Sequence, residues 1–345
     1  MSAGYLHACG VRSDHTLWCW GSNWYGALGD GTTTERSVPT RVGTAATWAS
    51  VTAGWSRTCA IQTDGTLWCW GFNTWGQVGD GTTAHRQLPT RIGTATDWVA
   101  ASAGKSHTCG VRAGGTLWCW GYNVDGRVGD GTTTNRYQPV QAGVAADWAS
   151  VTAADRHTCG LRQDHTLWCW GYNAQGQVGT DEADELWSPV RVGTATDWAS
   201  VSTGGLHTCA IDVDAALWCW GNNGNSQLGV GRGAGGPLPR QVVEGATAWK
   251  AVAAEQAATC AIDVDAALWC WGYNLEEGYG DWVSTDWVLP LRLDTTTTWT
   301  TIDYGNGFLC MIDTQGALWG WGTNGYGQLG DGAPTARRST PVRVG

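Results

Sequence analysis

Residues 57–83 read RTCAIQTDGTLWCWGFNTWGQVGDGTT, and close copies of this stretch recur along the 345-residue chain. The first cysteine of each copy is the clearest marker, because successive copies lie 50, 50, 50, 50, 51 and 50 residues apart. These cysteines are Cys9, Cys59, Cys109, Cys159, Cys209, Cys260 and Cys310. A fixed period of roughly 50 residues is typical of propellers and other repeat arrays.

Each copy contains four short segments that we expect to be β-strands, and none has helical periodicity. In the second copy these segments are 49–54 (ASVTAG), 57–61 (RTCAI), 67–71 (LWCWG) and 89–92 (PTRI). The intervening Thr63, Asp64 and Gly65 fit a three-residue hairpin loop with glycine in the left-handed conformation.

Symmetry about this hairpin loop places Cys59 opposite Cys69 and Ala60 opposite Trp68. Alternation along the strands then puts both cysteines on one face of the sheet and Trp68 and Trp70 on the other. Four-stranded units that repeat around an axis bury both faces against their neighbours and leave only short edges.

We therefore predict an all-β fold, a seven-bladed β-propeller of four-stranded antiparallel blades, as a single domain of residues 1–345. The approximate repeats are 1–47, 48–97, 98–147, 148–197, 198–248, 249–298 and 299–345. The first copy begins late, so its innermost strand is expected to be short.

The repeat pattern is G-x-x-H-T-C-[AG]-[VIL]-x-x-D-G-T-L-W-C-W-G-x-N-x-x-G-Q-[LV]-G-D-G-T-T. It resembles the regulator-of-chromosome-condensation repeat, in the cysteine- and tryptophan-rich form of bacterial secreted proteins. The resemblance covers essentially the whole chain and implies a seven-bladed propeller. It does not imply one activity, because the family includes an exchange factor for a small GTPase, a plant UV-B photoreceptor and a bacterial β-lactamase inhibitor.

Six copies carry a second cysteine ten residues after the first, directly across the hairpin and within bridging distance. We predict the disulfides Cys9–Cys19, Cys59–Cys69, Cys109–Cys119, Cys159–Cys169, Cys209–Cys219 and Cys260–Cys270. The alternatives are free buried thiols of a cytosolic protein and, less favoured without C-x-x-C spacing, a metal site. Cys310 faces Gly320 and is expected to be an inert buried thiol.

Six disulfides predict an exported protein, extracellular or periplasmic, although the start MSAGYLHACG lacks the basic and apolar segments of a signal peptide. The net charge of −10 and the isoelectric point near 5.0 disfavour nucleic acid as a partner. No stretch approaches the ~18 consecutive apolar residues of a membrane span, so we expect no membrane insertion. We also expect a monomer.

Two recurring polar motifs have structural interpretations. A histidine precedes the marker cysteine in four copies and is expected to hydrogen-bond its local turn, not to bind a metal; these are His7, His107, His157 and His207. The aspartate of the GDGTT motif, at positions 30, 80, 130 and 331, is expected to bond its own turn. The residue order suggests no catalytic set, and we predict no enzyme activity, no metal and no cofactor.

The copies disagree most between the WGxN motif and the fourth strand. Copies four and six carry acidic, tryptophan-bearing loops, TDEADELWSP (180–189) and LEEGYGDWVSTDWVLP (275–290), on either side of a glycine-rich loop in copy five. This arrangement predicts a cleft whose indoles and carboxylates would bind a sugar or a basic or aromatic protein anchor. The candidate ligand-binding residues are Asp184, Glu185, Trp187, Tyr279, Asp281, Trp282, Asp286 and Trp287. Drift of surface loops, with the tryptophans packed inward, is the alternative.

The loop before the histidine position also varies between copies and is a weaker candidate surface, which we assign to a second rim around the central opening. Its candidate residues are Tyr5, Trp55, Lys105, Asp155 and Arg156. The resulting prediction is a non-catalytic interaction scaffold that recognises a protein partner through rim loops. A carbohydrate-binding propeller is the alternative, and an enzyme of unknown type comes third.

Overall fold

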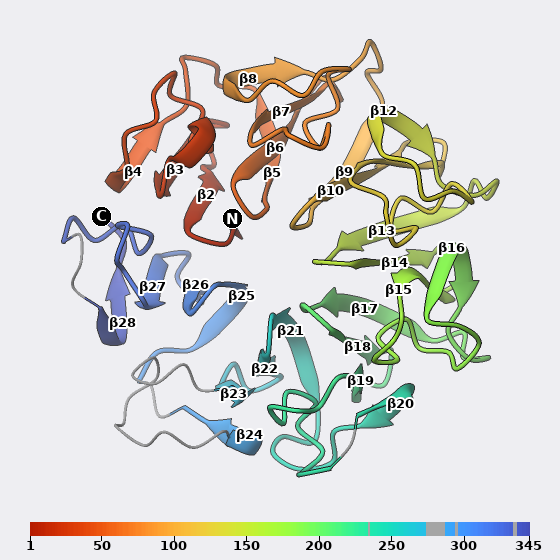
Figure 1. Ribbon diagram of the computed structural model, residues 1–345. Coiled ribbons are helices and arrows are strands. Elements are labelled where there is room, and N and C mark those ends of the chain that lie inside the picture. The colour runs from red at the N-terminus through yellow and green to blue at the C-terminus, as the bar shows by residue number, and fades with distance from the viewer. Residues whose placement is uncertain (234, 274–286, 294–295, 334–336) are drawn as a thin grey trace.

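The computed structural model describes residues 1–233, 235–273, 287–293, 296–333 and 337–345. Its strands form seven four-stranded antiparallel sheets that radiate from one axis (Figure 1). Within each sheet the strands follow chain order from the axis outward. The predicted all-β, seven-bladed propeller is therefore confirmed.

The sheets, called blades 1 to 7 from here on, have the following strands. Blade 1 has β1 (Ser2–Ala3), β2 (His7–Val11), β3 (Leu17–Gly21) and β4 (Arg36–Arg41); blade 2 has β5 (Trp48–Ala53), β6 (Arg57–Gln62), β7 (Leu67–Gly71) and β8 (Arg86–Arg91); blade 3 has β9 (Trp98–Ala103), β10 (His107–Arg112), β11 (Leu117–Gly121) and β12 (Arg136–Gln141); blade 4 has β13 (Trp148–Ala153), β14 (His157–Arg162), β15 (Leu167–Tyr172) and β16 (Glu185–Arg191). Blade 5 has β17 (Trp198–Thr203), β18 (His207–Asp212), β19 (Leu217–Gly221) and β20 (Gly236–Gln241); blade 6 has β21 (Trp249–Glu255), β22 (Ala258–Asp263), β23 (Leu268–Gly272) and β24 (Trp287–Arg292); blade 7 has β25 (Trp299–Gly305), β26 (Phe308–Asp313), β27 (Leu318–Gly322) and β28 (Arg338–Arg343). A single 3-10 turn, η1 (Trp24–Gly26), is the only helix of the described part.

The central hairpin of each blade has the predicted register. In blade 2, Cys59 faces Cys69 and Ala60 faces Trp68, and Gly65 in the turn has a φ of +74°. A side chain at Gly65 would also meet the Thr96 carbonyl 2.3 Å from its Cβ. All six predicted disulfides are present, with Cα–Cα distances of 4.1 Å.

Neighbouring blades pack a cysteine face against a tryptophan face. Between blades 2 and 3, the disulfide of Cys59 and Cys69 and the side chain of Leu67 contact Trp98 and Trp120. Equivalent clusters fill the other spaces between blades, so the recurring indoles form the core of the ring.

The histidines that precede the marker cysteines bond to the next blade. His7 Nε2 lies 2.9 Å from Thr58 Oγ1, and Thr58 in turn donates to the carbonyl of Ala27 over 2.8 Å. His107, His157 and His207 repeat this contact. The expectation of a bond to the local turn is therefore wrong, because the partner lies about one repeat further along the chain.

Burial lowers the pKa of these histidines, to about 4 for His7 and to about 3 for His157 and His207. Since the threonine hydroxyl donates onward to a carbonyl, Nε2 carries the ring proton and Nδ1 is bare. A second proton on Nδ1 would be buried, and for His157 and His207 no described residue accepts it. The neutral imidazole is thus the folded form.

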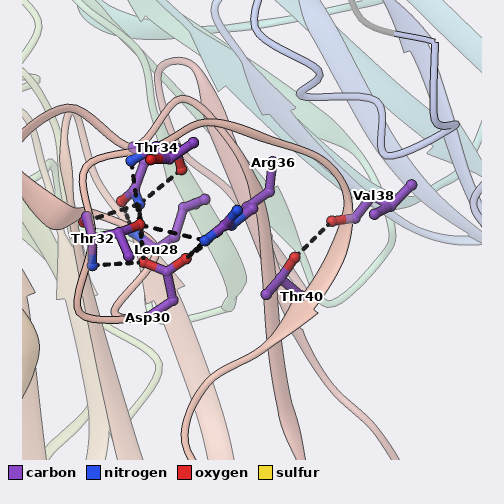
Figure 2. A network of polar contacts seen from close by, with 8 residues as sticks. Leu28, Asp30, Thr32, Thr34, Arg36, Val38 and Thr40 are labelled. Carbon is purple, nitrogen blue, oxygen red and sulfur yellow. Dashed lines mark hydrogen bonds and ion pairs between the residues drawn. The ribbon is translucent and has the colours of Figure 1, made fainter.

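The GDGTT aspartate organises the loop between the third and fourth strands (Figure 2). Asp30 Oδ1 accepts hydrogen bonds from the backbone and hydroxyl of Thr32, and Oδ2 pairs with Arg36 at 2.7 Å. The turn role that the motif predicts is confirmed, and the ion pair to the first residue of the fourth strand extends it. Asp80, Asp130 and Asp331 form the same pair with an arginine.

Blades 7 and 1 close the ring face to face. Strand β1 has only two residues, as expected, and the Ala3 amide donates to Asp303 Oδ2 of blade 7 over 2.9 Å. Cys310 is a buried free thiol opposite Gly320, packed with Trp20 of blade 1. Burial raises the pKa of the Cys310 thiol, which makes it a poor nucleophile.

Candidate functional site

Both sets of variable loops lie at the same end of the propeller. The strands of a blade alternate in direction, so the loop after the first strand and the loop after the third meet at one end. In blade 2 the amide of Phe72 donates to the carbonyl of Ser56 over 2.9 Å, and in blade 3 Tyr122 does the same to Ser106. The assignment of Tyr5, Trp55, Lys105, Asp155 and Arg156 to a second rim is therefore wrong. We call this shared end the loop rim.

An acidic groove lies on the loop rim between blades 4 and 5. Its volume is about 800 Å³, and it is lined by carboxylates of blade 4 and by amides of both blades, among them Asp181, Glu182, Asp184, Asn222 and Asn223. The glycine-rich loop of blade 5 contributes Gly233 and Gly235 to the lining. The position of the groove agrees with the predicted cleft, and its use as a binding site stays a prediction.

Trp187, predicted to lie in this cleft, points elsewhere. Its ring packs on Gly126 of blade 3, where a Cβ would meet Trp187 Cδ1 at 2.4 Å. The indole is 47% exposed and donates to Glu185 Oε2 over 3.3 Å. Neither Trp187 nor Glu185 is among the described residues that line the groove.

The blade 6 half of the predicted site is largely outside the described residues. Tyr279, Asp281, Trp282 and Asp286 belong to residues 274–286, which the structure does not describe. Trp287 begins β24, and its side chain is outside the described part. These five residues remain candidates from the sequence alone.

The central opening gathers four of the five loop residues that precede the histidine position. Tyr5, Trp55, Lys105 and Asp155 line it together with Glu255. Lys105 Nζ lies 3.2 Å from Asp155 Oδ2. Burial, with the negative charge of Asp155 nearby, raises the pKa of Glu255 to about 8. Glu255 is therefore mostly protonated near neutral pH.

An aromatic pocket, defined by Trp55, Phe72, Trp75 and Tyr122, lies on the loop rim across blades 2 to 4. Its volume is about 510 Å³. The ring centroids of Trp55 and Phe72 lie 5.5 Å apart, and those of Trp75 and Tyr122 lie 4.8 Å apart. Val124 completes the apolar wall.

Cationic side chains line the same pocket. Lys105, Arg127 and Arg156 contribute to it, against one lining carboxylate, that of Asp155. Behind the wall, buried Asp125 accepts hydrogen bonds from both arginines, with Arg156 at 2.9 and 3.0 Å. These bonds raise the pKa of Arg156, whereas burial lowers the pKa of Arg127.

Sequence reasoning missed Phe72, Trp75 and Tyr122 because they lie inside the WGxNxxG motif, whose recurrence indicates scaffold. For Phe72 and Tyr122 the informative signal was variation between copies at the first variable position of that motif. It is occupied by Ser22, Phe72, Tyr122, Tyr172, Asn222, Tyr273 and Thr323. Such variation at a fixed scaffold site is the same criterion that selected the acidic loops.

The described residues contain neither a metal-binding cluster nor a membrane-spanning helix. No group of three or more His, Cys, Asp or Glu side chains there is arranged to hold a metal ion. No helix in that part of the chain has the length and apolar character needed to cross a membrane.

Comparison with solved structures shows the same fold in several proteins. Human WBSCR16 is 21% identical, with 97% of this chain and 94% of that chain covered and a TM-score of 0.85. Yeast RCC1 (Prp20), solved bound to Kap60, is 19% identical over 93% of this chain and 79% of that chain, with a TM-score of 0.78. The ectodomain of the Arabidopsis thaliana receptor kinase ACR4 is 21% identical over 98% of each chain, with a TM-score of 0.61.

Sequence comparison identifies the repeat itself. No curated protein sequence matches the chain. A family model described as the regulator of chromosome condensation (RCC1) repeat matches residues 14–61, 64–111, 114–161, 164–211 and 315–345, which together exceed half of the chain. A second model with the same description matches residues 48–77, 98–127, 148–177, 198–227 and 299–328. The chain therefore belongs to the family of proteins built from regulator of chromosome condensation (RCC1) repeats.

Proposed function

We propose that this protein is a non-catalytic binding module that recognises a protein partner through its loop rim. The observation that carries the proposal is the aromatic pocket on the loop rim. Four aromatic side chains and three cationic side chains line it. Clustered Trp, Tyr and Arg side chains are typical of the residues that dominate binding energy at protein interfaces.

The framework supports this function because it holds the loops in place. Each blade is fixed to the next by buried indoles and by hydrogen bonds such as Trp120 Nε1 to the Gln77 carbonyl at 3.0 Å. Loops on such a scaffold lose little conformational entropy when a partner binds. A yeast relative of the same fold, Prp20, was solved in complex with the protein Kap60.

The six disulfides favour an oxidising compartment for the proposed encounter. We infer that the protein acts outside the cytosol, at a bacterial cell surface, in a periplasm or in the extracellular medium. The partner would then be an exported or surface protein.

A crosslinking and capture experiment tests the proposal. Trp75→Ala removes one exposed wall of the pocket and should lower recovery of a partner that wild-type protein captures reproducibly, in keeping with an affinity loss of about 30-fold for a central interface tryptophan. Val144→Ser is the matched control, because Val144 is 97% exposed and follows the fourth strand of blade 3, at the opposite end. Equal capture by wild type and Trp75→Ala would contradict recognition through the pocket.

The acidic groove between blades 4 and 5 supports the carbohydrate alternative. Asn222 Nδ2 donates to Gln175 Oε1 across the groove over 2.8 Å, and such amides beside Asp181 and Asp184 suit hydroxyl groups. A glycan array with wild-type protein tests this directly. Binding that is lost in Asp181→Ala and kept in Trp75→Ala would favour the sugar hypothesis over the protein hypothesis.

A further inference from the structure

We propose that the aromatic pocket accepts an acidic–aromatic segment of a partner protein, in which an aromatic side chain is flanked by Asp or Glu. This inference rests on the proposed function and specifies the partner's chemistry. Three independent features of the pocket point to it: its ring walls, its surplus of cationic groups and its difference from the neighbouring groove.

The ring walls provide an apolar surface for one flat side chain. Trp55 and Phe72 meet nearly edge to face, at 79°, and Trp75 leans against Tyr122 at 48°. Because the two rings of each pair are already in contact, a further ring would pack beside them in an offset or edge-on contact. The volume of about 510 Å³ is ample for an indole or phenol side chain and its neighbours.

The pocket has an excess of positive charge, whereas the chain as a whole is negatively charged. The protein carries a net −10, yet Lys105, Arg127 and Arg156 outnumber Asp155 and the buried Asp125 by three to two. One of only two lysines in the sequence, Lys105, stands at this wall with its side chain 44% exposed. A carboxylate of an incoming segment would therefore be attracted here.

The buried Asp125 holds both arginines in fixed positions, and Arg156, whose side chain is 42% exposed, is the one that an incoming carboxylate can reach. Arg127 donates to Ser106 Oγ at 2.7 Å and to the Asp155 carbonyl at 2.8 Å, while its Nε is buried and bonds to no described residue. Arg156 lies 3.7 Å from the ring centroid of Tyr172. A guanidinium held in place in this way, that of Arg156, suits a carboxylate acceptor.

The equivalent space between blades 4 and 5 shows the opposite character. There Asn222 replaces the aromatic residue of the motif, and the lining carries Asp181, Glu182 and Asp184 with no lysine or arginine among its described residues. Gln175 and Asn222 of the groove occupy the motif positions of Trp75 and Tyr122 in the pocket, so at these positions the difference lies in the side chains. A partner segment rich in Lys or Arg would be directed to the groove and away from the pocket.

Three matched peptides test the inference by isothermal titration calorimetry on the oxidised full chain: acetyl-Glu-Trp-Glu-amide, acetyl-Lys-Trp-Lys-amide and acetyl-Glu-Ala-Glu-amide. We expect the first to bind about tenfold more tightly than either of the others, because only it supplies both the ring and the negative charges. Comparable affinity for the basic peptide, or no detectable binding of the acidic one, would overturn the inference.

Variants locate the binding. Lys105→Gln should weaken the acidic peptide roughly twofold to fivefold, and Trp75→Ala about tenfold or more. Two control variants change residues that do not line the pocket. Lys250→Gln removes the other lysine, which is exposed in β21. Trp24→Ala removes an indole of blade 1 that is 42% exposed, against 41% for Trp75. Effects of equal size in these controls would refute the site. If Trp75→Ala no longer captures the partner but the acidic peptide does not bind the wild type, the proposed function stands and only this inference is rejected.

Discussion

Gly79 provides the sharpest test of how the blades are held together. It belongs to the GQVGD segment of blade 2, has a φ of +90°, and faces the indole of Trp120 in blade 3. A Cβ at this position would lie 2.4 Å from Trp120 Nε1 and 2.8 Å from Cδ1. The same Nε1 donates to the carbonyl of Gln77 over 3.0 Å. Gly79→Ala therefore combines backbone strain with displacement of a fully buried ring.

The expected loss in the free energy of unfolding is the sum of three contributions. An alanine in the left-handed region costs about 1 kcal/mol, overpacking against a fixed ring costs about 1–3 kcal/mol, and loss of the indole hydrogen bond costs about 1 kcal/mol. We expect Gly79→Ala to lower the free energy of unfolding by about 3–5 kcal/mol. Gly93 in the same repeat isolates the backbone part, since its φ is +61° and a Cβ added there would meet no atom within 4 Å. Gly93→Ala should lower the free energy of unfolding by about 1 kcal/mol.

The assay is urea unfolding of the oxidised wild type and both variants, followed by near-ultraviolet circular dichroism, which reports on packed indoles. Equal unfolding free energies for Gly79→Ala and Gly93→Ala would refute the reasoning, because the contact with Trp120 would then carry no energy. A large loss in both variants would show that the backbone conformation alone dominates.

Three further predictions concern buried polar groups and the cysteines. His157 has a folded pKa of about 3 against about 6.5 unfolded, so the unfolded chain takes up the proton first and the unfolding free energy should fall by up to about 1.4 kcal/mol per pH unit per buried histidine below pH ~6.5. His157→Phe, the residue type of Phe308 at the equivalent site, should make that slope shallower in urea titrations from neutral to mildly acidic pH, and an unchanged slope would contradict the assignment. Alkylation of the denatured, unreduced protein should label one cysteine, Cys310, by intact mass; thirteen labels would show a reduced protein. In the blade 2 loop, Asp80→Ala should lower the unfolding free energy by about 1–3 kcal/mol, because the Asp80 carboxylate is buried and accepts several hydrogen bonds. Arg86→Met should lower it by less than about 1 kcal/mol, because the Arg86 side chain is 35% exposed. A larger loss for Arg86→Met than for Asp80→Ala in thermal unfolding would refute this account.

The blade hairpin was predictable because its contacts are local. The turn at Gly65 sets the register by itself, and the register then fixes which residues face each other, including Cys59 and Cys69. Six copies of that pattern were enough to predict the disulfides, and seven copies of the strand pattern were enough to predict the ring. The GDGTT loop followed the same logic, since Asp30 bonds to residues within a few positions of itself.

The histidine contacts were not predicted because they depend on another repeat, and the shared loop rim was missed although it follows from the alternating strand directions within one copy. His7 finds its partner Thr58 51 residues later, on a different blade. The loops after the first and third strands lie at the same end of the propeller because the strands alternate in direction, as the bond from Phe72 to Ser56 shows. The sequence does not show which aromatic residues of the motif contact one another.

The sequence by itself determined the repeat, the strand order, the hairpin register and the cysteine pairing, because each of these depends on residues within one copy. Only the tertiary structure decided what lies between copies: the packing of Trp75 on Tyr122, the sharing of Asp125 by two arginines, and the turning of Trp187 away from the acidic groove. The physical reason is that near-identical blades offer near-identical interfaces. The character of each interface then depends on the few side chains that differ, and their contacts exist only when the ring is closed.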